Sequence, residues 1–185
     1  MQILMVGIFI FLGIHLVPTS GQLRRSLITR LGEGPYKGIF SLISLTSLIL
    51  IIYGKAHAPF IAVWTPPVWG RWAALALMPI SLTLIAATYL PNNLKRYTPH
   101  PMLWGVMAWA TAHLLANGDL AAVLLFGSFG LFSVIDIVSA NNRGAALSRT
   151  THPWSMDALT VVTGIAVFAV VLSFHSRLFG VSVFT

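Results

Sequence analysis

The sequence predicts an all-α fold, a polytopic bundle of about six transmembrane helices. Of its 185 residues, 57% are apolar and only 8% are charged, which is more hydrophobic material than one soluble core of this length can bury. Six apolar stretches approach the roughly 17 to 25 residues that a helical span requires. Cysteine is absent, so disulfides, thiolate metal sites and a cysteine nucleophile are excluded.

The predicted spans follow one another along the whole chain. They are residues 2–17, 38–54, 72–90, 101–116, 120–138 and 158–175. The first and fourth are short, about 24 Å each at 1.5 Å per residue, so they cross only with local thinning of the bilayer or with help from flanking polar residues. The first could instead be a signal peptide, but it lacks a basic region before its apolar run and is followed at once by basic residues, so we expect it to remain a span.

Basic residues between the spans predict the orientation. The chain has eleven Lys and Arg against four Asp and Glu, a net charge of +7. Eight of the eleven lie in residues 18–37, 91–100 and 139–157, so these segments are expected in the cytoplasm, with both termini in the periplasm. Because the bases lie between apolar runs, they indicate membrane topology and not a nucleic-acid partner.

Residues 18–37 are expected to form a cytoplasmic amphipathic segment. Leucines at helical spacing would face the membrane, and arginines between them would face water. These residues are Leu23, Leu27 and Leu31, and Arg24, Arg25 and Arg30. Ser26 or Thr29 is the candidate to start or satisfy this short helix.

Three ionisable residues are expected at one depth near the cytoplasmic surface. His15 ends the first span, His100 begins the fourth, and Asp136 lies one turn from the cytoplasmic end of the fifth. An ionisable residue inside a span costs roughly 2.5 to 3.5 kcal/mol on insertion scales, so three together indicate a functional site. Two imidazoles facing each other across a bundle, with a carboxylate to orient one ring, suit a haem or metal site.

A purely structural interpretation remains open for these residues. His15 and His100 could bond loop backbone or lipid headgroups, and Asp136 could pair with a nearby arginine. His113 lies thirteen residues beyond His100, about 20 Å along the helix and about 220° around it, so the two cannot bind one metal ion. Asn117 can bond His113 from the same helix face, and Asp119 is expected to cap the fifth span. The remaining histidines, at loops or ends, are expected to be solvated or interfacial: His57, His152 and His175.

Several long motifs with polar residues inside apolar runs resemble the NnrU family of bacterial membrane proteins. They are GIHLVPTS at 13–20, RLGEGPYKGIFSLISL at 30–45, HPM at 100–102 and LWGVMAWATAHLLANGDLAAVLLFGSF at 103–129, with Asp136 beyond them. The similarity runs from about residue 4 to residue 143. It predicts a single NnrU-like transmembrane domain over residues 1–185, of which residues 144–185 are less typical of the family.

The resemblance implies a link to denitrification, the reduction of nitrite and nitric oxide. NnrU proteins are similar to the cis-zeta-carotene isomerase, which holds haem b with histidines. On that likeness His15 and His100 are the expected haem ligands, His113 is the rival, and Asp136 would support a ligand. The iron would then bind a diatomic gas, respond to redox state, or isomerise a hydrophobic polyene.

A second sequence resemblance suggests a different function. RYTPHPMLWG at 96–105 is similar to a motif of membrane methyltransferases that bind S-adenosylmethionine. Those enzymes complete the cofactor site with acidic residues near the C-terminus, whereas the last 45 residues here contain one acid, Asp157. We therefore expect a haem-binding membrane protein with lipid, gas or small hydrophobic ligands and denitrification proteins as partners.

Overall fold

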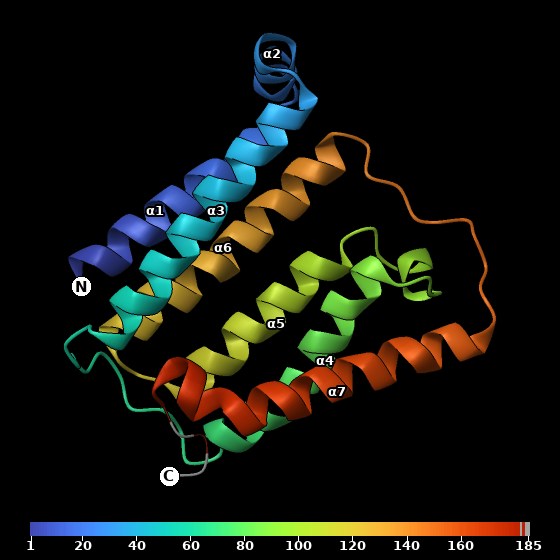
Figure 1. Cartoon of the computed structure of the whole chain (residues 1–185). Helices are drawn as coiled ribbons and strands as arrows, with labels where there is room; N and C mark the ends of the chain where they lie inside the picture. Colours follow the sequence, from blue (N-terminus) through green and yellow to red (C-terminus); the bar gives the residue numbers. More distant parts are fainter. Residues whose placement is uncertain (182, 184–185) are drawn as a thin grey trace. The chain divides into compact units, whose positions relative to one another are not determined.

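The computed structural model describes residues 1–181 and 183. Within them the chain forms seven α helices and two short 3-10 helices (Figure 1). The elements are α1 (Gln2–Leu16), η1 (Val17–Thr19), α2 (Gly21–Leu31), α3 (Glu33–Ala56), α4 (Gly70–Tyr89), η2 (Leu94–Arg96), α5 (Pro101–Ala116), α6 (Leu120–Asn142) and α7 (Trp154–Phe179). Two compact units make up the chain, residues 1–61 and residues 62–185. The predicted all-α class is therefore confirmed.

The first unit is built on the antiparallel pair of α1 and α3. Glycines lie where the two helices meet: a Cβ added at Gly7 would be 2.8 Å from the backbone nitrogen of Ile51, and one at Gly54 would collide with the backbone of Leu4. Leu4 and Ile51 are buried at these points. The absence of side chains at the two glycines thus lets the backbones approach closely, as is common between helices in membranes.

The predicted amphipathic helix forms as α2, but it begins earlier than expected. The Ser20 hydroxyl accepts a hydrogen bond from the backbone N–H of Leu23 at 3.3 Å, so Ser20 is the N-cap. Thr29 donates its hydroxyl to the carbonyl of Arg25 in the next-to-last turn. Gly32, with φ of 85°, then ends α2 and allows α3 to start at the following residue.

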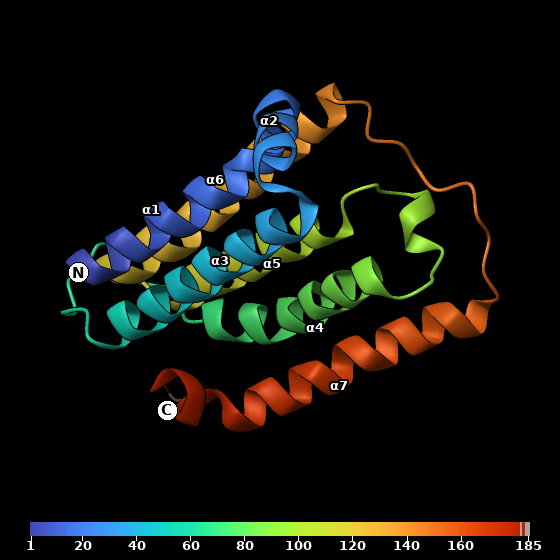
Figure 2. The same cartoon turned by 45° about the horizontal axis from the view of Figure 1, so that its top comes forward.

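In the second unit α4 lies between α5 and α7, and α5 also packs against α6 (Figure 2). The contacts again use glycine. A Cβ on Gly105 of α5 would lie 2.9 Å from the carbonyl oxygen of Ser81, and one on Gly164 of α7 would lie 2.5 Å from the Cα of Thr83. The buried Ser81 hydroxyl donates to the Gly105 carbonyl at 2.8 Å, which adds a polar bond between α4 and α5.

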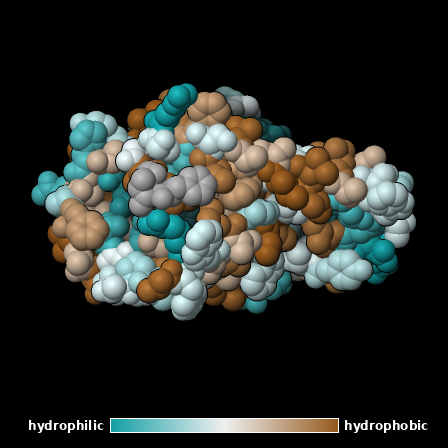
Figure 3. All heavy atoms as spheres, turned by 90° about the horizontal axis from the view of Figure 1, so that it is seen from below, coloured by the Kyte–Doolittle hydropathy of each residue, from teal (hydrophilic) through white to brown (hydrophobic). Residues whose placement is uncertain are grey.

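Five of the helices are long and apolar enough to cross a membrane. The candidate spans are Gln2–Thr19, Glu33–Ala56, Gly70–Tyr89, Leu120–Asn142 and Trp154–Phe179. Large apolar side chains on these helices remain exposed, with Phe9 81% and Val162 62% accessible. Figure 3 shows hydrophobic side chains at the surface of one face. Lipid is the environment that such side chains require.

The remaining predicted span, α5, has 16 residues and is shorter than these five. However, α5 lies alongside α4 over most of its length, so the two helices span the same part of the membrane. Gly70, which begins α4, lies against Leu115 near the end of α5, while Ser81 lies against Gly105. Because the two helices run antiparallel in this register, α5 crosses wherever α4 crosses, which agrees with a prediction of about six spans.

Replacing Gly164 tests the contact of α7 with α4. We expect Gly164→Ala to lower the free energy of unfolding by about 1–3 kcal/mol, because the added Cβ overpacks the site against Thr83. Gly127→Ala on α6 is the matched control, since nothing lies within 4 Å of a Cβ there. Thermal unfolding in detergent measures both. Equal destabilisation by the two variants would contradict the close contact.

Candidate functional site

His15 lies in the last turn of α1, within the first unit. Its Nδ1–H donates to the carbonyl of Phe11 at 2.7 Å, because a carbonyl oxygen can only accept. The ring stacks on Phe11 with centroids 4.1 Å apart and meets the edge of Phe40 at 5.1 Å. A neutral imidazole held in this way carries its lone pair on Nε2.

His113 has the same arrangement on α5, within the second unit. Its Nδ1–H donates to the carbonyl of Trp109 at 2.9 Å, and the ring stacks on Phe126 with centroids 4.4 Å apart. The predicted contact with Asn117 is confirmed, since its amide donates to the His113 carbonyl at 2.8 Å. The ring of His175 of α7 also lies near, with its centroid 6.5 Å from that of His113.

A shared sequence pattern explains these two sites. Each histidine has an aromatic residue four positions earlier, so the aromatic ring and the carbonyl acceptor come from the same turn of helix. His57 at the end of α3 follows the same pattern. Its Nδ1–H donates to the backbone carbonyl of Tyr53 at 2.8 Å, and its ring stacks on the Tyr53 ring with centroids 4.1 Å apart. Unlike the other two, His57 is exposed. The spacing of aromatic and histidine was the signal available in the sequence.

His100 is placed differently. It is the N-cap residue of α5, is 8% exposed, and donates its Nε2–H to the side-chain oxygen of Asn141 at 2.8 Å. This bond joins the start of α5 to the end of α6. Ligation through Nε2 would require the bond to break, so the local geometry favours a bridging role for His100. Asn141 was missed in the sequence because it lies among other polar residues at a helix end.

Asp136 pairs with Arg143 on its own helix, with 3.5 Å between the carboxylate oxygen and the guanidinium nitrogen. The two residues lie seven positions apart, two turns of α6. The interpretation of Asp136 as the partner of a nearby arginine is therefore the one that its contacts favour. Asp119 caps α6 as predicted, since its carboxylate accepts from the N–H of Ala122 at 3.0 Å.

The second unit thus brings His100 and Asp136 toward the same end of α5 and α6, and places His113 near the opposite end with His175. His15 belongs to the first unit. Its pairing with His100 stays a prediction. The meeting of His113 with His175 was not expected, because the two are 62 positions apart and no local spacing indicates it.

The candidate histidines His15 and His113 are oriented one at a time, each by a carbonyl of its own helix. Within residues 1–181 and 183, no three His, Cys, Asp or Glu side chains lie close enough to hold a metal ion. A porphyrin supplies four ligands to its iron and needs only axial imidazoles from the protein. The orientation of His15 and His113 by a carbonyl on Nδ1 is the outer-shell support that ligating histidines typically have.

The fold and its exposed apolar helices define a multi-pass α-helical membrane protein. The chain belongs to the NnrU family: the family model described as NnrU protein matches residues 3–183. This match extends beyond the motifs at 4–143, runs across both units and includes α7. No curated protein and no solved structure was found to match.

Removing the partner of His100 tests the bridge between α5 and α6. We expect Asn141→Ala to lower the free energy of unfolding by about 0.5–1.5 kcal/mol, because the part-buried Nε2–H of His100 exchanges its side-chain acceptor for water. Asn142→Ala, next to it on the same exposed helix end, is the control. Thermal unfolding in detergent measures the difference. A loss that persists unchanged in a His100→Ala background would show that the bond is not its cause.

Proposed function

We propose that this NnrU protein binds haem b through histidine imidazoles in the membrane. We propose further that it serves denitrification as a redox or gas-responsive accessory factor in nitrite or nitric oxide reduction. The observation that carries the haem proposal is a repeated one: a carbonyl of its own helix accepts the Nδ1–H of a half-buried imidazole, and an aromatic ring, Phe11 for His15 and Phe126 of α6 for His113, stacks on that imidazole. The denitrification role rests on membership of the family alone.

The local contacts rank the candidate ligands. His15 and His113 each direct the proton to Nδ1 and keep the lone pair on Nε2, the nitrogen that would ligate iron. His100 holds its proton on Nε2 for Asn141. We therefore place His15 and His113 ahead of His100 as ligands, each judged within its own unit.

The chemistry divides between cofactor and protein. A bound haem supplies an iron that accepts one electron or one diatomic ligand such as nitric oxide. The chain's own contribution is to set the ring orientation of each imidazole, to raise its basicity through the carbonyl bond, and to surround it with apolar side chains that exclude water. Phe126 and Trp109 do this for His113, as Phe11 and Phe40 do for His15.

The absorption spectrum of the purified protein tests the proposal. We expect a Soret band in detergent that is reduced several-fold in His15→Ala or in His113→Ala, whichever of the two supplies the axial imidazole. His57→Ala should keep the full band, since His57 has the same helix contacts but is exposed. Haem content per protein, from the pyridine haemochrome, is the quantity compared.

Other results would change the assigned ligand or contradict haem binding. A band lost in His100→Ala and kept in His113→Ala would restore His100 as the ligand. A colourless protein, prepared from cells supplied with a haem precursor, would contradict haem binding. Binding of S-adenosylmethionine by that colourless protein would favour the methyltransferase interpretation.

We also propose that the protein lies in the bacterial inner membrane with both termini in the periplasm. The basic loops and the crossing of α5 beside α4 support this orientation. A periplasm-dependent reporter fused after Thr185 should be active, and the same reporter fused within residues 144–149 should be inactive. Activity at the second position alone would mean that the orientation is inverted, and an inactive fusion after Thr185 with an active one before Met1 would mean that α5 does not cross.

A further inference from the structure

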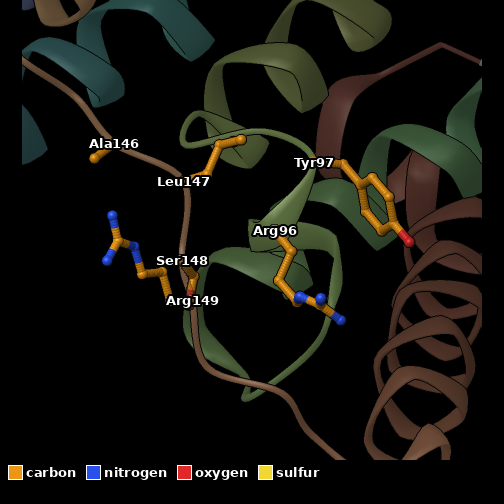
Figure 4. A pocket seen from close by; sticks show the side chains of 6 residues that line it. All are labelled: Arg96, Tyr97, Ala146, Leu147, Ser148 and Arg149. Atoms are coloured by element: carbon orange, nitrogen blue, oxygen red, sulfur yellow. The ribbon is translucent and has the colours of Figure 1, made fainter.

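A pocket opens in the second unit beside the connection between α6 and α7 (Figure 4). Its volume is about 530 Å³. Two segments line it, residues 96–97 after η2 and residues 146–149 of the connection. Figure 4 shows Arg96 and Arg149 on either side of the chain at Leu147 and Ser148, with the Tyr97 ring beyond Arg96.

Backbone and side-chain bonds hold the two walls together. The N–H of Ser148 donates to the carbonyl of Lys95 at 2.9 Å. Further along, the Asn93 amide donates to the carbonyl of His152 at 2.8 Å and accepts from the His152 N–H at 2.9 Å. The connection, although without regular structure, is therefore fixed at two points, Ser148 against η2 and His152 against Asn93.

The two arginines of the pocket carry uncompensated charge. Within the part of the chain that the structure describes, neither guanidinium has a hydrogen-bond or ion-pair partner. The acids at this end of the unit are already engaged: Asp157 accepts from the backbone and side chain of Asn93, and Asp136 pairs with Arg143. Arg96 and Arg149 are thus available to an anion from outside the chain.

The surroundings of the pocket are amphipathic. Tyr97 is 80% exposed and Leu147 is 51% exposed, and both line the pocket. Trp154, also highly exposed, begins α7 at the same end of the unit. Exposed tyrosine and tryptophan at the ends of spanning helices are typical of the headgroup level of a bilayer. A ligand here would meet positive charge and apolar surface together.

We propose that this pocket binds anionic phospholipid at the headgroup level, with Arg96 and Arg149, which lie on opposite sides of the connection, each donating to a lipid phosphate. A guanidinium presents paired N–H groups that match phosphate oxygens, and juxtamembrane bases are attracted to anionic headgroups. Tyr97 and Leu147, exposed beside the arginines, would meet the glycerol and upper acyl region of the bound lipid. The excess of bases at this end, four against Arg71 and Arg177 at the other, agrees with an anionic leaflet. The four are Lys95, Arg96, Arg143 and Arg149.

Lipid titration of the full chain in detergent tests the site. Phosphatidylglycerol should raise the melting temperature of the wild type more than phosphatidylcholine does at equal concentration. The double variant R96Q/R149Q should bind phosphatidylglycerol roughly 25-fold more weakly, from about fivefold for each base. Arg177→Gln is the matched control: it removes one positive charge at the other end of the unit, where Arg177 lies over Phe174, and should keep the preference.

Each other outcome overturns the proposal. No preference of the wild type for phosphatidylglycerol, or a preference that survives in the double variant, removes the site. A shift produced by inorganic phosphate and not by lipid would identify a soluble anion as the ligand. If the double variant does not fold, R149Q alone is used, because Arg149 is exposed in the irregular connection; retention of wild-type affinity by R149Q would then contradict the assignment.

Discussion

Close contact of helix backbones at glycine is the constraint on which the rest of the structure depends. Within an apolar solvent, burial of hydrophobic side chains does not favour the association of helices, so fit and a few polar bonds must supply it. Gly54 against Leu4 sets the register of α1 on α3, and Gly105 and Gly164 set that of α5 and α7 on α4. The depth of each histidine follows from these registers. A side chain at any of the three glycines would shift a whole helix.

Local features of the structure could be predicted from the sequence. The predicted span at 101–116 matches α5 residue for residue, because proline starts it and a polar turn ends it. Asp119 caps α6 as expected. By contrast, α6 continues to Asn142 beyond the predicted end at 138, since polar residues can extend a helix past its apolar run without a change of structure. The length of an apolar run locates a spanning helix well and its polar ends poorly.

The candidate site was predicted only in part, for a related reason. Bonds within one helix, such as that of Asn117 with His113, follow from spacing. The bond of His100 with Asn141 and the approach of His175 to His113 join different helices and depend on their register, which no pattern in a single sequence encodes. The pocket at Arg96 and Arg149 likewise needs the connection between α6 and α7 to fold back onto η2.

The bonds that fix His15 and His113 have a consequence for how such a protein can vary. In each case the acceptor is a main-chain oxygen of the preceding turn, so the tautomer of the ring is insensitive to mutation of the residue that supplies that oxygen. Only unwinding of the helix, for example by proline, would remove it. Neighbouring aromatic side chains are therefore free to diverge among related chains and to tune the surroundings of the imidazole while its chemical state is preserved.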